Sequence, residues 1–270
     1  SWGAELAAGR LPISVELLPP RTPDMSGLVA AARVLKEAGA NAINLPDGPR
    51  ASARISNLAA AAIIQRDAGL DAIVHFCCRD RNLLGMQSDL LGAAALGLRD
   101  LLIITGDPPY QGNYPEVTAV FDVDAIGLCN IVDQMNHGLD LGGNPLGAQT
   151  SFCFGAAWNH AALDPRRERE RFDWKLRAGV DFFITQPVFD PEGFMQALAE
   201  LPSTRPPVLA GIWPLRSLRN AEFLHSEVPG VHLPVEVLER MERADAKGRA
   251  AEEGIALARA AIERLRDSVQ

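Results

Sequence analysis

The chain has 270 residues, 47% of them hydrophobic and 22% charged, and its formal net charge at pH 7 is -8. This length accommodates one large α/β barrel or two small domains. The acidic balance excludes a typical nucleic-acid-binding protein, and no stretch approaches the ~18 continuous apolar residues of a membrane span. The four cysteines lack metal-binding spacing, so we expect reduced thiols, no metal site and a cytoplasmic location.

Strands alternate with helices along most of the chain. After a short helix over 2–10, apolar runs bounded by turn residues predict strands at 13–18, 41–45, 72–76, 101–105, 150–156, 182–186 and 208–212. Helical patterns follow them at 24–38, 53–67, 82–96, 122–137, 165–178, 191–201 and 218–226. Seven such units predict an α/β fold, a parallel TIM (β/α)8 barrel that forms one domain over residues 1–270.

The eighth strand of this barrel is the open point. Residues 231–233 are apolar but few, and they lie between Gly230 and Pro234. Residues 235–247 and 249–267 have the pattern of two helices. Either residues 231–233 complete the barrel, or its last strand is missing from residues 1–270.

The clearest site signal lies at the end of the fourth predicted strand. The buried run Leu101–Ile104 ends abruptly at Thr105, Gly106 and Asp107, which places a carboxylate at the C-terminal end of a strand. Gly106 permits close approach of the backbone beside that carboxylate. The alternative is an ordinary turn in which Asp107 caps the next helix.

Further functional side chains stand at the ends of other predicted strands: Glu16, Asp47, His75, Trp158 and Gln186. Active sites of TIM barrels lie at this face, so their convergence predicts an enzyme. Glu16 has apolar neighbours, which would raise its pKa and suit a general acid, unless it forms a salt bridge to Arg21 or to a neighbouring strand. Gln186 has a planar amide that could recognise the edge of a heterocycle or could bond to the sheet backbone.

In order and spacing, several of these segments resemble the methylenetetrahydrofolate reductase family. The resemblance is carried by Val15–Arg21, His75, Thr105–Asp107, Lys175 and Ile184–Gln186. Residues 45–51, 139–144 and 211–215 look most like the branch whose reductase is often fused behind a homocysteine methyltransferase. The family implies a TIM barrel that binds FAD and uses NADH or NADPH to reduce folate. It also implies a homo-oligomer and a functional link to a homocysteine or cobalamin-dependent methyltransferase.

The same resemblance implies roles for individual residues. Glu16 would protonate N10 of 5,10-methylenetetrahydrofolate and open its imidazolidine ring, and Asp107 would favour the resulting iminium cation. Gln186 would contact the pterin and, in the other half-reaction, the nicotinamide. Residues that match cofactor contacts are His75, Thr105, Gly106, Asp107, Phe121, Asp122, Trp158, His160, Glu168, Arg171 and Lys175.

Five positions depart from the family pattern, among them Trp158 in place of a tyrosine and Glu168 in place of an aspartate. Pro46 and Asp47 replace a threonine and an aromatic residue, and Trp174 replaces an arginine that usually meets the FAD phosphates. Direct hydride transfer from NAD(P)H to folate therefore stays open, as does a non-catalytic subunit that binds folate or FAD. The choice between NADH and NADPH also stays open, because the chain has no nucleotide-binding motif in which a ribose-reading residue could be assigned.

Overall fold

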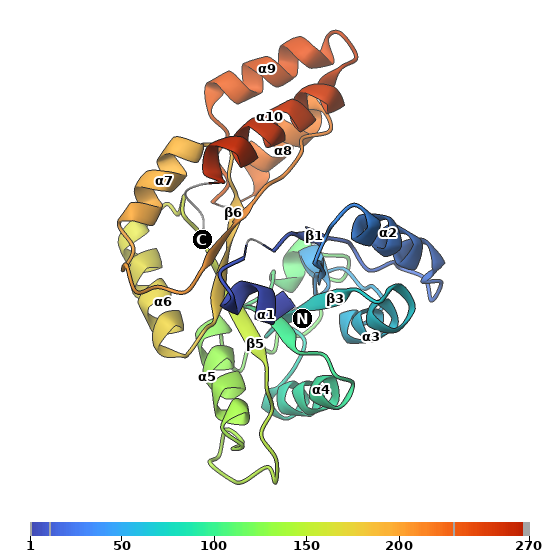
Figure 1. Cartoon of the computed structure of the whole chain (residues 1–270), viewed down its shortest axis with the longest axis vertical. Helices are drawn as coiled ribbons and strands as arrows, with labels where there is room; N and C mark the ends of the chain where they lie inside the picture. The colour runs from blue at the N-terminus through green and yellow to red at the C-terminus, as the bar shows by residue number, and fades with distance from the viewer. Residues whose placement is uncertain (1, 11, 229, 267–270) are drawn as a thin grey trace. The chain divides into compact units, whose positions relative to one another are not determined.

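The structure is a computed structural model that describes residues 2–10, 12–228 and 230–266 (Figure 1). Within these residues the chain forms seven strands and ten α-helices. They divide into two compact units. The first unit contains Ser1–Ala156 with Arg177–Asp181, and the second contains Ala157–Leu176 with Phe182–Gln270.

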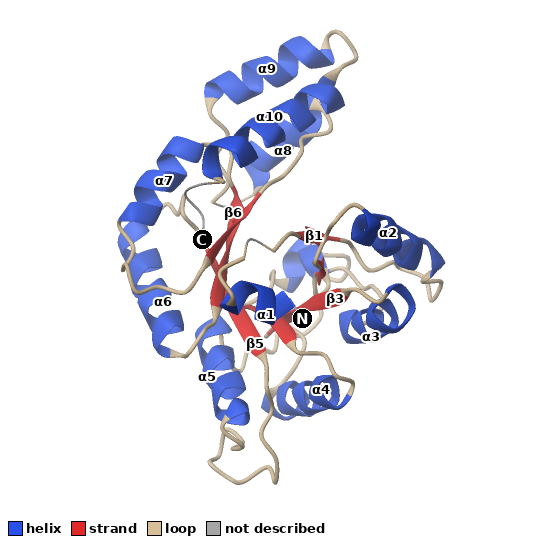
Figure 2. Ribbon diagram, viewed as in Figure 1, coloured by secondary structure: helices blue, strands red, loops and turns tan. Residues whose placement is uncertain are grey.

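The first unit is built on parallel strands that pair in chain order. These are β1 (Ser14–Glu16), β2 (Ala42–Leu45), β3 (Asp71–Cys77), β4 (Asp100–Ile104) and the first residues of β5 (Cys153–Trp158). Its helices are α1 (Trp2–Ala7), α2 (Ser26–Glu37), α3 (Asn57–Ala68), α4 (Leu83–Ala95) and α5 (Ala125–Asn136). Strands β2, β3 and β4 are almost entirely buried, as expected of Val, Ile and Leu runs covered on both faces. Figure 2 shows helices beside these strands, among them α3, which packs on β3.

Two short 3-10 turns mark the ends of strands in the first unit. Turn η1 (Pro49–Ala51) follows β2, and turn η2 (Pro109–Gln111) follows β4. The two turns contact each other. A Cβ atom at Gly112, just after η2, would lie 2.1 Å from the Ala51 carbonyl oxygen, so the two loops meet backbone to backbone.

The second unit contains the parallel strands β6 (Phe182–Pro187) and β7 (Val208–Gly211). Its helices are α6 (Pro165–Arg177), α7 (Pro191–Ala199), α8 (Leu218–Glu227), α9 (Val235–Asp245) and α10 (Ala250–Leu265). Helices α8 and α9 enclose a small core that includes Leu215, Leu224 and Met241. A Cβ atom at Gly254 would lie 1.8 Å from the Leu215 carbonyl oxygen, so α10 packs directly on the backbone that follows β7.

The strand order is β1-β2-β3-β4-β5-β6-β7, with helices between successive strands. This arrangement confirms the predicted α/β, TIM-barrel-like fold. The suggestion that residues 231–233 complete the barrel is wrong, because Val231 and Leu233 bury their side chains in the core of α8 and α9. The Leu233 N–H donates to His225 Nδ1 at 3.3 Å instead of to a strand. No described residue after β7 belongs to a strand.

Some predicted boundaries shift for local reasons. The strand predicted at 150–156 spans Cys153–Trp158, because Thr150 and Phe152 bond to the Asn136 side chain. The helix predicted from 122 begins at Ala125, where the Asp124 side chain accepts hydrogen bonds from the first turn. Within the described ranges, every helix is too short or too polar to cross a bilayer.

Candidate functional site

Asp107 lies just after β4 and points its carboxylate toward the loop that follows β2. Its Oδ2 atom accepts a hydrogen bond from the Arg50 N–H at 2.7 Å. The N-cap of η2 is Pro108, so the alternative in which Asp107 caps the next helix is wrong. Gly106 has φ of 96°, and a Cβ there would lie 3.1 Å from Cys77 Cβ, so a side chain at this position would be strained.

The loop after β2 adopts an unusual backbone. Gly48, Arg50 and Ala51 have φ of 51°, 56° and 46°, in the left-handed region that non-glycine residues rarely enter. The Asp107 carboxylate and the Ser52 hydroxyl, which donates to Pro49 O at 2.9 Å, hold this loop in place. A strained backbone of this kind persists only where several neighbouring contacts hold it in place, and it is frequent at functional sites.

A buried arginine bridges the loops after β2, β3 and β4. Arg79 is 4% exposed. Its guanidinium donates to the carbonyl oxygens of Asp47 and Asp107 at 3.3 and 3.4 Å and makes two bonds to the Asp80 carboxylate. Arg79 therefore fixes the backbone on both sides of the Asp107–Arg50 bond. The sequence reasoning missed this residue, although it lies three residues after the end of a predicted strand.

Asp47 belongs to the same network of charges. Its Oδ2 atom accepts from the Cys77 N–H at 3.1 Å and from Arg81 at 2.7 Å, and Arg81 also pairs with Asp89. The Asp47, Cys77 and Asp80 ligand atoms lie within 4.8 Å of one another. Both carboxylates are bound to arginines, and burial raises the pKa of Cys77 to about 12. This donor set forms an ion-pair cluster rather than a metal centre.

His75 is buried on β3 and takes part in a chain of polar contacts across three strands. Its Nε2 atom lies 3.2 Å from Asn44 Oδ1, and Asn44 Nδ2 donates to the Ser14 hydroxyl at 2.7 Å. Burial lowers the pKa of His75 to about 4, so the imidazole is neutral at pH 7. With Asn44 Oδ1 as acceptor, Nε2 carries the proton.

Glu16 is the last residue of β1. Its side chain is exposed at the tip, yet desolvation by the surrounding protein raises its pKa. Among the described residues its carboxylate makes no hydrogen bond or ion pair, so the alternative of a salt bridge to Arg21 is wrong.

The other predicted residues of the first unit make backbone bonds. The Thr105 hydroxyl accepts from the Ala125 N–H at 3.2 Å, at the start of α5. Asp122 Oδ2 accepts from the Leu83 N–H at 3.1 Å, at the start of α4. Phe121, before it, has φ of 41°. These bonds fix the loops around the end of β4.

In the second unit, Lys175 connects α6 to the end of β5. The Lys175 side chain is buried, and its Nζ atom donates to Ala157 O at 2.6 Å and lies 3.9 Å from Glu168 Oε1. Glu168 in turn accepts from the Asn159 N–H at 3.0 Å. Trp174, where the family has an arginine, is half exposed. Two of the residues predicted to contact FAD in this unit, Lys175 and Glu168, are thus engaged with the protein backbone.

Trp158 and His160 belong to an aromatic cluster in the second unit. The His160 ring lies 6.2 Å from Trp158 and 5.3 Å from Phe194, centroid to centroid. Burial lowers the pKa of His160 to about 4, and its Nδ1 atom is buried with no hydrogen-bond partner within the described part. The Gln186 side-chain amide, near the end of β6, likewise makes no hydrogen bond to any described residue. The alternative in which this amide bonds to the sheet backbone is therefore wrong. Arg171 is partly buried on α6.

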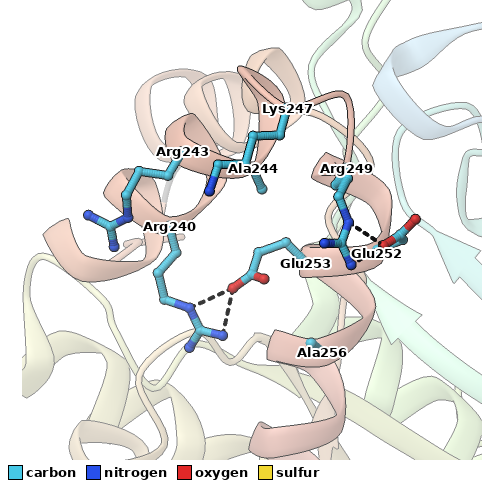
Figure 3. Close-up of a pocket in the computed structure, with 8 residues that line it drawn as sticks. All are labelled: Arg240, Arg243, Ala244, Lys247, Arg249, Glu252, Glu253 and Ala256. Atoms are coloured by element: carbon cyan, nitrogen blue, oxygen red, sulfur yellow. Dashed lines mark hydrogen bonds and ion pairs between the residues drawn. The ribbon is translucent and has the colours of Figure 1, made fainter.

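A pocket of about 450 Å³ lies between α9 and α10 (Figure 3). None of the predicted site residues lines it. Ion pairs between Arg240 and Glu253 and between Arg249 and Glu252 cross or border it. Four cationic side chains and two carboxylates line it, and none of the predicted strand-end residues reaches it, so we do not assign the reaction to this pocket.

The chain is similar to known proteins over most of its length. The family model for methylenetetrahydrofolate reductase matches residues 3–269. "Methylenetetrahydrofolate reductase 2" of Schizosaccharomyces pombe is 22% identical over 205 residues, which are 68% of this chain and 29% of that protein. The chain thus spans less than a third of this curated relative.

Solved structures share the fold. A Clostridium thermocellum protein superposes with a TM-score of 0.65 at 13% sequence identity, and the alignment covers 98% of this chain and 86% of that protein. It is described as binding two copies of 5-methyl-5,6,7,8-tetrahydrofolic acid. A 2,3-dimethylmalate lyase superposes with a TM-score of 0.53 at 13% identity, covering 98% and 86%. At these identities the likeness shows the fold alone. The family match over residues 3–269 shows that the chain belongs to the methylenetetrahydrofolate reductase family.

Proposed function

We propose that this protein reduces 5,10-methylenetetrahydrofolate to 5-methyltetrahydrofolate with NADH or NADPH as the source of hydride. The observation that carries the proposal is Glu16. The chain belongs to this family, and its Glu16 is an unpaired carboxyl group at the end of a strand, with a raised pKa. A binding protein has no need of an acid at this position, whereas ring opening of the substrate requires a proton donor.

The first step uses the Glu16 proton. The carboxyl donates it to N10 of the substrate, the bond between N10 and the methylene carbon breaks, and a 5-iminium cation forms. Hydride transfer to the methylene carbon then gives the 5-methyl product, and the nicotinamide leaves oxidised. The raised pKa keeps a larger fraction of Glu16 protonated near neutral pH than an ordinary carboxyl would have.

Asp107 and Gln186 would act on the folate ring. One Asp107 oxygen is bonded to the Arg50 N–H, which orients the carboxylate so that its negative charge can stabilise the iminium cation. The Gln186 amide has both donor and acceptor capacity unused by the described residues, which suits recognition of a pterin edge. The neutral imidazole of His75 adds no charge beside this reaction.

Two routes for the hydride are candidates. The family resemblance favours FAD, which would relay hydride from the nicotinamide to folate and whose phosphates Arg171 and Lys175 would meet. The second route, direct transfer from the nicotinamide to folate, is favoured by Lys175, whose ammonium is already bound to Ala157 O. The same resemblance supports a homo-oligomer that works with a methyltransferase, and the free cysteines suit the cytoplasm.

An absorbance scan from about 300 to 550 nm distinguishes the two routes, since only a flavin absorbs strongly near 450 nm. It is paired with an assay of 5-methyltetrahydrofolate formation from NADH or NADPH, with and without added FAD. A yellow, active protein supports the flavin route, and a colourless, active protein supports direct transfer. If folate binds but no nucleotide yields product in the presence of FAD, the protein is a binding subunit and the proposal is wrong.

A further inference from the structure

Two arginines line a groove in the first unit, at the C-terminal ends of β1 and β2. The groove has a volume of about 340 Å³ and is lined by Arg21, Thr22, Pro23, Ala53, Arg54 and Ile55. Apart from the two guanidinium groups, no lining residue carries a charge. The groove is therefore locally cationic in a chain whose net charge is -8.

Two hydrogen bonds join the segments that carry the two arginines. Arg54 Nη1 donates to Pro19 O at 2.8 Å, and the Ile55 N–H donates to Pro20 O at 3.0 Å. These bonds join the loop after β1 to the segment before α3 and place two like charges on one groove.

The protein itself does not neutralise these charges. Neither Arg21 nor Arg54 pairs with any described acid, whereas Arg66 in the same unit pairs with Asp67 at 2.6 Å. The Nε atom of Arg54 is buried and has no hydrogen-bond partner in the described residues. Part of the donor capacity of this guanidinium is therefore left unused by the chain.

We propose that Arg21 and Arg54 form a subsite for the anionic end of a substrate, either a carboxylate or a phosphate. Guanidinium groups bind both anions through paired, charge-assisted hydrogen bonds. The inference rests on the proposed function, because both proposed substrates carry such an end: the glutamate carboxylates of folate and the phosphates of the nicotinamide nucleotide. Arg21 follows Glu16 by five residues, across the two prolines that stiffen the loop.

The experiment compares Arg21→Ala, Arg54→Lys and Arg66→Ala with the wild type. R21A removes an exposed side chain with no described hydrogen bond, R54K keeps a donor for Pro19 O, and R66A removes the same charge elsewhere in the unit. Equilibrium dialysis measures binding of 5-methyltetrahydrofolate with one and with four glutamates, and of NADH and NADPH. Steady-state kinetics give KM and kcat for 5,10-methylenetetrahydrofolate with one and with four glutamates, and for NADH and NADPH.

We expect R21A and R54K to weaken binding by about tenfold, with kcat within about twofold of the wild type and with R66A unchanged. A loss confined to the folates, larger for four glutamates, identifies a carboxylate; a loss confined to the nucleotides identifies a phosphate. Unchanged affinity for all four ligands in both variants would overturn the subsite. Wild-type protein that binds folate but does not turn it over would contradict the proposed function and leave the binding comparison valid.

Discussion

The Oδ2 atom of Asp107 accepts a hydrogen bond from the Arg50 N–H at 2.7 Å, and this bond joins the end of β4 to the loop after β2. An amide oxygen can accept the same bond, so Asp107→Asn removes the charge and keeps the contact. We expect D107N to lower kcat for folate reduction by about 100-fold and to change the free energy of unfolding by less than about 1 kcal/mol. Steady-state kinetics and urea denaturation measure the two effects.

Asp107→Ala is the matched control, because it removes both the charge and the bond. D107A should lose as much activity as D107N and should also unfold more easily, by about 1 kcal/mol. If D107N keeps the kcat of the wild type, the carboxylate does not stabilise the reacting cation. If D107N and D107A lose equal stability, the charge itself, and not the hydrogen bond, holds the loop.

Arg79 should be needed for the backbone geometry around Asp107. Arg79→Met leaves the carbonyl oxygens of Asp47 and Asp107 without their donor, and we expect a loss of about 1–3 kcal/mol in the free energy of unfolding. The partner carboxylate of Asp80 is half exposed, so its ion pair adds little to this loss. Hydrogen exchange should become faster in residues 46–51 and 105–111.

Arg79→Lys is the control for charge, since lysine keeps the cation but cannot span two carbonyls and a carboxylate with one rigid fork. We expect R79K to show the same faster exchange in both loops, with a smaller loss of stability. Exchange that increases throughout the first unit, instead of in these two loops, would contradict a local positioning role.

The sequence predicted which strand ends carry the side chains but not the contacts that position them. His75, Asp107 and Glu16 could be found because each follows or lies within a local apolar run that indicates a buried strand. Arg79 could not be placed, since its two carbonyl partners lie 28 and 32 residues away and are backbone atoms, which leave no mark on residue type. The same holds for Asp122, whose partner at the start of α4 is 39 residues distant.

The region after β7 shows a second limit of pattern reading. Val231 and Leu233 alternate as a short strand would, but alternation over three residues equally fits side chains that fill a gap between helices. The structure uses them for the core of α8 and α9. A short strand and a segment that fills the core between helices are distinguished only by how the helices pack. That packing depends on residues spread from Leu215 to Ala250.

Glu16 should control both the rate and its dependence on pH. Glu16→Gln keeps the shape of the side chain but has no proton to donate, so we expect kcat for folate reduction to fall by at least about 100-fold. Dialysis of 5-methyltetrahydrofolate should give a Kd within about threefold of the wild type, because the amide still fills the site. In the wild type, kcat should fall as pH rises through the raised pKa of Glu16, since the acid must be protonated.

The control for Glu16 is Glu37→Gln, which changes an exposed carboxylate at the end of α2 and should leave the rate and its pH profile unchanged. A pH profile of E16Q with the same fall as the wild type would assign that titration to another group. E16Q activity close to the wild-type value would exclude the acid role altogether.

Asp100 should make stability depend on pH in the direction opposite to most acidic residues. It is 3% exposed at the start of β4, and burial, together with the nearby charge of Asp71, raises its pKa to about 7. The folded state therefore binds this proton more tightly than the unfolded state, whose pKa is about 3.9. Its contribution to stability is fully present below about pH 4 and is lost as pH rises to about 7, by up to about 1.4 kcal/mol per pH unit.

Asp100→Asn isolates this effect, because the amide cannot ionise. His75 and His160, whose pKa values are lowered to about 4, change the stability in the opposite direction, and they do so equally in the wild type and in D100N. Both histidines favour the unfolded state as pH falls from about 6.5 to 4, so the wild-type curve alone mixes the two trends. Urea denaturation of the wild type and D100N at pH 5, 6, 7 and 8 gives the difference between their free energies of unfolding.

The wild type should gain stability relative to D100N as pH falls from 7 to 5, because only Asp100 distinguishes the proteins. A difference that does not vary with pH would mean that Asp100 is ionised in the folded protein throughout this range, and that Asp71 and burial do not hold its proton.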